Sequence, residues 1–135
     1  MDYLLSEKTG KILKAFYDVY NQLGYGFLER VYKNALFIEL KDCGFDCSTE
    51  KSLTVFYKGH AVGNYFADII VDNSIIIEIK AVKAIVSEHE AQLMNYLRAT
   101  DAEVGLLLNF GPDPQIRRII FTNDNKKPKM NYLNQ

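Results

Sequence analysis

The sequence predicts an α/β fold: a three-layer α/β/α sandwich, in which helices cover both faces of a mixed sheet of four to five strands. Three observations lead to this prediction. Two amphipathic helical patterns open the chain, three β-rich segments follow without a helix between them, and a nearly all-apolar segment comes after one further helix. A strand that is apolar on both sides needs cover on both faces of its sheet. The expected order of elements is ααβββαββ.

The first two helices are predicted from the spacing of their apolar residues. Over residues 6–23 these side chains recur at steps of three and four, which is typical of one buried helical stripe. Gly24 and Gly26 then interrupt the pattern. A second helix is expected over residues 28–42, with Gly44 as a left-handed stop. Two helices therefore precede any strand.

Three β-rich segments, residues 53–57, 61–71 and 74–80, follow these helices. Turn residues separate them, at Lys58-Gly59-His60 and at Asp72-Asn73. Segments rich in β-branched residues and joined by short turns favour antiparallel pairing. We therefore expect an antiparallel meander in the middle of the chain.

The remaining predicted elements are one helix and two strands. Ser87 and Glu90 have the spacing of a capping box, which opens a helix that runs to about Thr100. Residues 104–110 are almost all apolar and suit a central strand, and residues 116–121 are the last strand candidate. Helices before and after the meander, followed by a strand buried on both faces, indicate a mixed sheet with a helical layer on each side.

The composition limits the class of protein. A chain of 135 residues, of which 48% are hydrophobic, fits one domain, expected over residues 1–122, followed by a polar, flexible tail over residues 123–135. A net charge of −1 argues against a protein that coats nucleic acid through bulk electrostatics, so any such contact must be local. No apolar run reaches the roughly 18 residues that span a bilayer, and the first residues do not form a secretion signal. We expect a cytoplasmic protein without membrane contact.

Charged side chains interrupt two of the apolar strands. Glu78 and Lys80 lie two residues apart in an isoleucine-rich strand, so the period of two places them on one face. Asp68 is the acid of the preceding strand. A three-residue turn, Asp72-Asn73-Ser74, sets Asp68 opposite Glu78, whereas a two-residue turn pairs Asp68 with Ile77 and breaks the site. The alternative explanation is a simple surface pair between Glu78 and Lys80 on an edge strand.

Two opposed carboxylates favour a divalent cation. Directly opposed Cβ atoms lie about 4.5 to 5.5 Å apart, which lets Asp68 and Glu78 bind one ion. Hard oxygen ligands completed by water suit Mg²⁺ or Mn²⁺ better than zinc. Lys80 beside that ion can hold and acidify an attacking water, while the metal offsets charge on phosphate oxygens. The pattern indicates a site for hydrolysing phosphodiester bonds.

The same residues resemble the signature of a known superfamily. Asp68, nine intervening residues and then Glu78-Ile79-Lys80 look like the active-site signature of the PD-(D/E)XK nucleases, which share a restriction-endonuclease-like core. Gly26, Glu29 and Tyr32 stand at the named positions of the GxxExxY proteins, a small-domain branch of that superfamily.

The resemblance covers about residues 6–121, with further similar blocks at residues 55–59, 89–97 and 104–111. Two positions depart from the family pattern, because Tyr25 stands where Pro is expected and Phe66 where Arg is expected. Neither departure involves the acids. The loss of a basic side chain just before Asp68 implies a weaker grip on phosphate.

The resemblance implies roles for residues outside the central trio. Glu29 would complete the metal site, although an acid that stabilises the first turn of its helix is an equally good explanation. Ile79 would contribute its backbone carbonyl to the ion, and Gln92 would accompany the acids. Tyr32 is expected to pack in the core.

Three further residues are candidates for substrate contacts: Lys83, His89 and Tyr96. His89, Gln92 and Tyr96 follow at i, i+3 and i+7 and form a polar stripe that can face the acids. For His89, a side chain that only completes the start of the helix is the competing explanation.

The preferred interpretation is a nuclease that uses Mg²⁺ or Mn²⁺ and acts on nucleic acid, with DNA favoured. A non-catalytic module of the same fold that binds DNA or a protein partner is the second interpretation, and a purely structural network of acids and lysine is the third. One site per chain cuts one strand, so cutting both strands of a duplex requires a homodimer or two visits.

Overall fold

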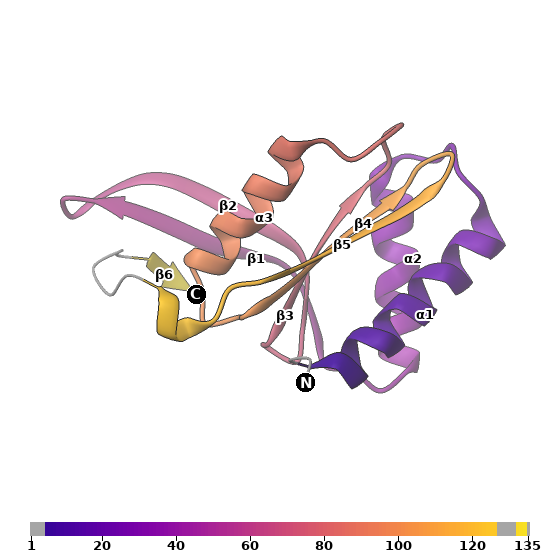
Figure 1. Ribbon diagram of the computed structural model, residues 1–135, viewed down its shortest axis with the longest axis horizontal. Coiled ribbons are helices and arrows are strands. Elements are labelled where there is room, and N and C mark those ends of the chain that lie inside the picture. Colours follow the sequence, from indigo (N-terminus) through magenta and orange to yellow (C-terminus); the bar gives the residue numbers. More distant parts are fainter. Residues whose placement is uncertain (1–4, 127–131, 135) are drawn as a thin grey trace.

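One six-stranded mixed sheet organises the chain, and helices lie on both of its faces (Figure 1). The computed structural model describes residues 5–126 and 132–134. The helices are α1 (Ser6–Leu23), α2 (Glu29–Asp42) and α3 (Ser87–Arg98), with a 3-10 turn, η1, at Asn123–Asn125. The strands are β1 (Cys47–Tyr57), β2 (His60–Val71), β3 (Ile75–Lys80), β4 (Val104–Phe110), β5 (Pro114–Ile120) and β6 (Tyr132–Asn134).

The strands follow the order β5-β4-β3-β2-β1-β6 across the sheet. Strands β3 and β4 pair in parallel because α3 forms the crossover between them, and the other neighbouring pairs of described strands are antiparallel. The predicted α/β fold class, its mixed sheet and its order of elements are confirmed. The sheet has one strand more than expected, since β6 adds to the outer side of β1.

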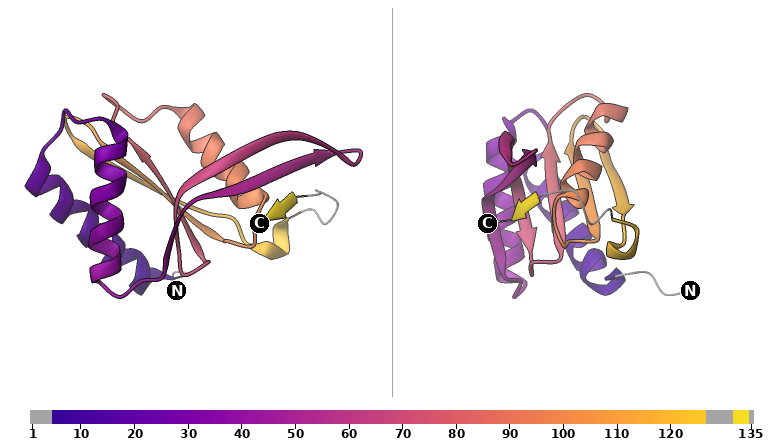
Figure 2. Two further views of the ribbon diagram at one scale, coloured as in Figure 1. Left: turned by 180° about the vertical axis from the view of Figure 1, so that it is seen from behind. Right: turned by 90° about the vertical axis from the view of Figure 1, so that its left-hand side faces the viewer.

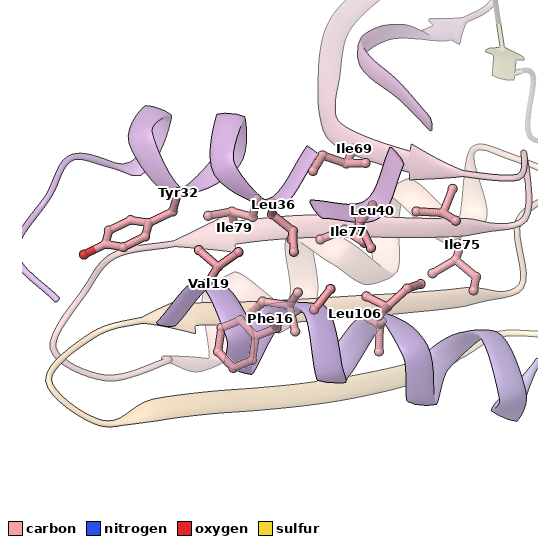
Figure 3. Close-up of a cluster of buried hydrophobic side chains, with 14 of the residues drawn as sticks. Phe16, Val19, Tyr32, Leu36, Leu40, Ile69, Ile75, Ile77, Ile79 and Leu106 are labelled. Carbon is pink, nitrogen blue, oxygen red and sulfur yellow. The ribbon is translucent and has the colours of Figure 1, made fainter. Parts of the chain in front are cut away.

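Two apolar clusters fill the space on either side of the sheet. The larger cluster lies between the sheet and helices α1 and α2, and it contains Ile75, Ile77 and Ile79 of β3 (Figure 3). Ile76 belongs to the cluster beneath α3 on the opposite face. Each buried isoleucine contributes roughly 1.5 to 3 kcal/mol of hydrophobic stabilisation. The strand that carries Glu78 is therefore held firmly from both faces.

Tyr32 joins this core to the loop between α1 and α2. Its ring is fully buried and stacks on Phe110, with ring centroids 4.4 Å apart. Its hydroxyl donates to the Gly24 carbonyl at 2.7 Å and accepts from the Phe27 amide at 3.2 Å. The core position expected for Tyr32 is correct, and the buried hydroxyl fixes the loop that leads into Glu29.

Strands β1 and β2 continue past β3 as a hairpin arm, and β6 pairs with part of β1 within this arm (Figure 2). Strand β2 pairs with β1 from His60 to Val71, but it pairs with β3 only from Ile69 to Val71. The residues of β2 that precede Ile69 are therefore not paired with β3. The sheet opens at that point between β2 and β3.

Of the two turns that the sequence left open, the β2–β3 hairpin has the three-residue turn, which sets Asp68 opposite Glu78. Val71 pairs with Ile75, which leaves Asp72, Asn73 and Ser74 in the turn. Asp72 and Asn73 adopt left-handed φ angles of 52° and 54°, and the Ser74 amide donates to the Val71 carbonyl at 2.9 Å. Asn and Asp tolerate this conformation better than most residues. The turn sets the register that the site needs.

The start of α3 differs from the prediction. The capping residue is Val86 rather than Ser87, and its amide donates to His89 Nδ1 at 3.2 Å. The Glu90 carboxylate instead pairs with Arg117 Nε on β5 at 3.2 Å, so it does not fold back onto the helix start. The predicted Ser87–Glu90 capping box is therefore wrong, because a tertiary ion pair engages its acid.

The end of the chain also contributes to the fold. Lys126 Nζ donates to the Thr100 and Ala102 carbonyls, at 2.7 Å each, and so ties residues after β5 to the end of α3. Residues 127–131 and 135 of the expected flexible tail lie outside the described residues, so the flexibility of the tail stays a prediction. In the described part of the chain, we find no helix with the length and apolar character to cross a membrane.

Candidate functional site

Asp68 and Glu78 lie where β2 and β3 separate. The paired positions end at Ile69 and Ile77, and one further step along this register places Asp68 opposite Glu78. At this step the side chains engage the backbone across the opening: Glu78 Oε2 accepts from the Asp68 amide at 3.2 Å, and Asp68 Oδ2 accepts from the Ile79 amide at 2.8 Å. Each carboxylate is thus held by the backbone of the other strand.

The position of Glu78 changes its acidity. Glu78 is buried, with only 6% of its surface exposed. This burial is the main cause that raises the pKa of Glu78 to about 8, and the negative charge of Asp68 is the second. The Asp68 amide and the Lys80 ammonium act in the opposite direction, and Glu29 raises the pKa slightly further. Two close carboxylates cannot both ionise easily without a compensating cation. The pair therefore has the electrostatics of a cation site.

A cavity of about 380 Å³ opens beside Asp68. Its lining comprises Glu29, Arg30 and Lys33 from α2, Asp68 from β2 and Ile79 from β3. Glu29 is thereby brought from the first turn of its helix to the same cavity as Asp68. The cavity lining therefore combines two carboxylates with two cationic side chains.

Lys80 and Tyr96 approach the acids from the α3 side of the sheet. Lys80 is half-buried and follows Glu78 on the same face of β3. Tyr96 is buried and packs edge-on against Tyr65, with centroids 5.4 Å apart. Burial raises the pKa of Tyr96, and the charges of Glu78 and Asp68 raise it further. Tyr96 is therefore electrostatically coupled to the acids.

The structure does not join the other candidates to the acids. Gln92 and Lys83 are exposed, and neither has a hydrogen bond to Asp68 or Glu78 among the described residues. His89 uses Nδ1 to accept the Val86 amide, which matches the simpler explanation of a helix-start residue. Lys83 lies in the loop before α3, His89 in the first turn of this helix and Gln92 one turn further along it.

Asn109 supports the site and was not identified from the sequence. Its fully buried amide accepts from the Val82 amide and donates to the Val82 carbonyl, at 2.9 Å each, and it also donates to Gln115 at 3.2 Å. Gln115 in turn accepts from the Ile85 amide at 2.9 Å. The segment after Lys80 is therefore tied to β4 and β5. The available signal was one amide side chain in an otherwise apolar strand.

The donor set suits a hard divalent cation. Within the described residues, no cluster of three or more His, Cys, Asp or Glu side chains has the arrangement of a complete metal site. The side chains of Asp68 and Glu78 nevertheless lie together at one opening, where burial and then the negative charge of Asp68 raise the pKa of Glu78. Oxygen donors completed by water are typical of Mg²⁺ and Mn²⁺.

Comparisons with known proteins agree with this geometry. The model of the PD-(D/E)XK nuclease superfamily matches residues 6–119. The fold is similar to the crystal structure of SSO0001, with a TM-score of 0.58 and 27% identity over 69% of this chain. The chain spans 50% of the length of that protein. A comparison with curated proteins finds no match.

The superfamily match includes both strands that meet at the opening of the sheet. It also includes the helix that brings Glu29 to the cavity and the crossover helix on the opposite face. With this match over most of its length and with the α/β architecture described above, the chain belongs to the PD-(D/E)XK nuclease superfamily.

Proposed function

We propose that this chain is a Mg²⁺- or Mn²⁺-dependent nuclease that hydrolyses phosphodiester bonds, with DNA as the favoured substrate. One observation supports the proposal most directly: Asp68 and Glu78 are held together by reciprocal bonds to the backbone at an opening in the sheet. Such bonds fix two carboxylates before any ligand arrives, which lowers the cost of ordering the site. We also propose that the chain belongs to the GxxExxY branch of its superfamily.

We propose the following roles for the side chains of the site. Asp68, Glu78 and the Ile79 carbonyl would hold the ion, and Glu29 would complete the set from α2. A bound divalent ion supplies Lewis-acid stabilisation of charge on the phosphate oxygens. Gln92 is proposed to orient water or substrate from α3.

Lys80 is proposed to position and activate the attacking water. Its ammonium would hold the water in line with the bond that breaks and favour loss of one proton from that water to solvent. The water oxygen would then form a bond to phosphorus while the bond to the leaving sugar oxygen breaks, and that sugar oxygen would take up a proton from solvent. Lys83, His89 and Tyr96 are proposed as substrate contacts around α3. A homodimer is proposed for cutting both strands of a duplex.

The test is a plasmid-nicking assay in Mg²⁺ or Mn²⁺. Wild type is expected to convert supercoiled plasmid to the nicked form, and Asp68→Asn, Glu78→Gln and Lys80→Met are expected to lose this activity. Asp113→Asn, in the exposed β4–β5 turn, is the matched control and should retain it. Cleavage that persists in all three site variants would show that a contaminant is responsible.

Metal binding is measured separately by calorimetric titration with Mn²⁺. Wild type is expected to bind and Asp68→Asn to lose binding. Binding of Mn²⁺ without cleavage of any nucleic acid would favour the second interpretation, a module that binds DNA or a protein partner. Absence of Mn²⁺ binding by wild type would remove the nuclease proposal.

A further inference from the structure

Exposed aromatic rings lie on two elements that lead into the cavity beside Asp68. Tyr25 and Phe27 belong to the loop directly before Glu29, and they are 62% and 48% exposed. Phe66 on β2 is 55% exposed. It precedes Asp68 by two residues, so both side chains leave β2 on the same side. A single exposed ring is ordinary on a protein surface, but rings on both approaches to one polar cavity call for a ligand with flat apolar faces.

The aromatic loop is held in place before any ligand binds. The Tyr32 hydroxyl bonds the Gly24 carbonyl and the Phe27 amide, and the Phe27 ring packs edge-on against Tyr32, with centroids 6.1 Å apart. A fixed ring loses little conformational entropy when a planar group stacks on it. The loop is therefore suited to present rings to a ligand.

The cationic side chains that line the cavity are few and come from one helix. Arg30 and Lys33 line the cavity, whereas the whole chain has a net charge of −1. Binding to the outside of a duplex depends mainly on many cationic contacts with phosphates. Single strands are bound in a different way, with a short cationic path for the backbone and aromatic rings on which unpaired bases stack.

Resting on the nuclease function proposed above, we propose that the substrate is a single-stranded nucleic acid or an unpaired strand end. Its bases stack on Tyr25 and Phe27 on one side of the cavity and on Phe66 on the other. The phosphate between them enters the cavity beside Asp68, where Arg30 and Lys33 offset its charge. The cavity of about 380 Å³ has room for one phosphate and the sugar beside it.

The experiment measures fluorescence anisotropy of labelled oligothymidylate, oligouridylate and a mixed-sequence duplex of equal length. It is carried out in a chelator, so that no cleavage occurs, with wild type and with Asp68→Asn. We expect the single strands to bind more tightly than the duplex. The DNA and RNA arms identify which single strand is preferred, and either preference agrees with the proposal.

Substitutions of the rings test the stacking itself. Phe66→Ala and Tyr25→Ala are each expected to weaken single-strand binding by about 5- to 150-fold, the equivalent of roughly 1 to 3 kcal/mol per stacked base. Phe66→Leu keeps an apolar side chain without a flat face and should also lose affinity, whereas Phe66→Tyr should retain it. Tyr57→Ala is the matched control, because Tyr57 is 63% exposed at the tip of the arm, and it should change binding by no more than about twofold.

The outcomes separate this inference from the nuclease proposal. Cleavage with equal or tighter duplex binding, and no loss in Phe66→Ala, would overturn the stacking assignment while leaving the nuclease in place. Single-strand binding that depends on the rings, without metal-dependent cleavage, would support the stacking assignment and contradict the proposed nuclease activity. If neither wild type nor Asp68→Asn binds oligonucleotides but sedimentation shows self-association that Phe66→Ala abolishes, the rings belong to a contact between copies and the proposal is wrong.

Discussion

The backbone amide of Asp68 donates to the Glu78 carboxylate across the opening between β2 and β3. In turn, the Asp68 carboxylate accepts from the Ile79 amide. The side chains of the two acids therefore form the hydrogen bonds between the strands at the point where regular backbone pairing ends. This arrangement places two carboxyl groups at one partly buried location. We therefore expect the stability of the protein to depend on pH and on divalent cations.

Without divalent ions, wild type should lose stability as the pH rises. The folded-state pKa of Glu78 is about 8 and its ordinary value is 4.5, so between these values the folded state holds a proton that the unfolded state has released. Stability therefore falls across pH 4.5 to 8 and the penalty is complete above pH 8. Glu78→Gln should remove this slope and be more stable than wild type at pH 9, by on the order of a few kcal/mol.

Urea unfolding in a chelator at acidic and alkaline pH measures this effect. Asp113→Asn serves as the control, since its exposed carboxylate should leave the slope unchanged. A wild-type stability that does not change between pH 5 and pH 9 would contradict the raised pKa of Glu78.

Adding Mn²⁺ should reverse the alkaline loss of stability in wild type. A ligand that binds the folded state alone stabilises it by about 2.7 kcal/mol when its concentration is 100 times Kd. The expected result is a higher Tm with Mn²⁺ at pH 8 in wild type and no increase in Asp68→Asn. A matching increase in both proteins would place the ion elsewhere on the chain.

Asn109→Leu should destabilise the fold and reduce activity. The substitution leaves both backbone groups of Val82 without the buried amide that pairs with them, which costs on the order of 2 to 4 kcal/mol for two unsatisfied groups. Because the tied segment follows Lys80 directly, nicking at a temperature where the variant is folded should also fall. Asn34→Leu, on the exposed side of α2, is the control, and activity equal to wild type in Asn109→Leu would limit Asn109 to stability alone.

Gly111→Ala should destabilise the protein, because a Cβ at this position would lie 2.1 Å from the Val82 carbonyl oxygen. Backbone has to move to relieve such an overlap, at a cost of roughly 1 to 3 kcal/mol or more. Gly10→Ala on α1 meets nothing within 4 Å and should instead stabilise by up to about 1 kcal/mol. Thermal unfolding of the pair checks both signs, and a neutral Gly111→Ala would show that the connection after Lys80 yields easily.

Local chemistry predicted the hairpin turn but left its register open between two alternatives. The Asp72-Asn73 pair favours left-handed backbone, which marks the turn, whereas the choice between a two-residue and a three-residue turn, and with it the opposed positions of Asp68 and Glu78, came from the structure. The helical patterns were readable for the same reason, since burial of a stripe depends on spacing alone.

Features that depend on distant partners were not predictable in this way. The Glu90–Arg117 ion pair joins α3 to β5, and the bond from Asn109 to Val82 joins segments 27 positions apart. The polar composition after residue 122 gave no sign of β6, because a short edge strand is stabilised by the backbone of the strand beside it. The approach of Glu29 to the cavity likewise depends on how α2 packs, which the resemblance implied but the spacing did not determine.

The opening between β2 and β3 has a consequence for how this site would change during evolution. Because Asp68 and Glu78 each bond the backbone of the opposite strand, selection for a stable sheet would preserve both acids in a descendant that no longer cuts nucleic acid. Among the described contacts, Lys80 makes no such bond to the backbone. If selection for activity is lost, substitutions are therefore expected at Lys80 before they occur at the two acids. Across related sequences, variation at position 80 with retention of both acids would mark the lineages that have become binding proteins.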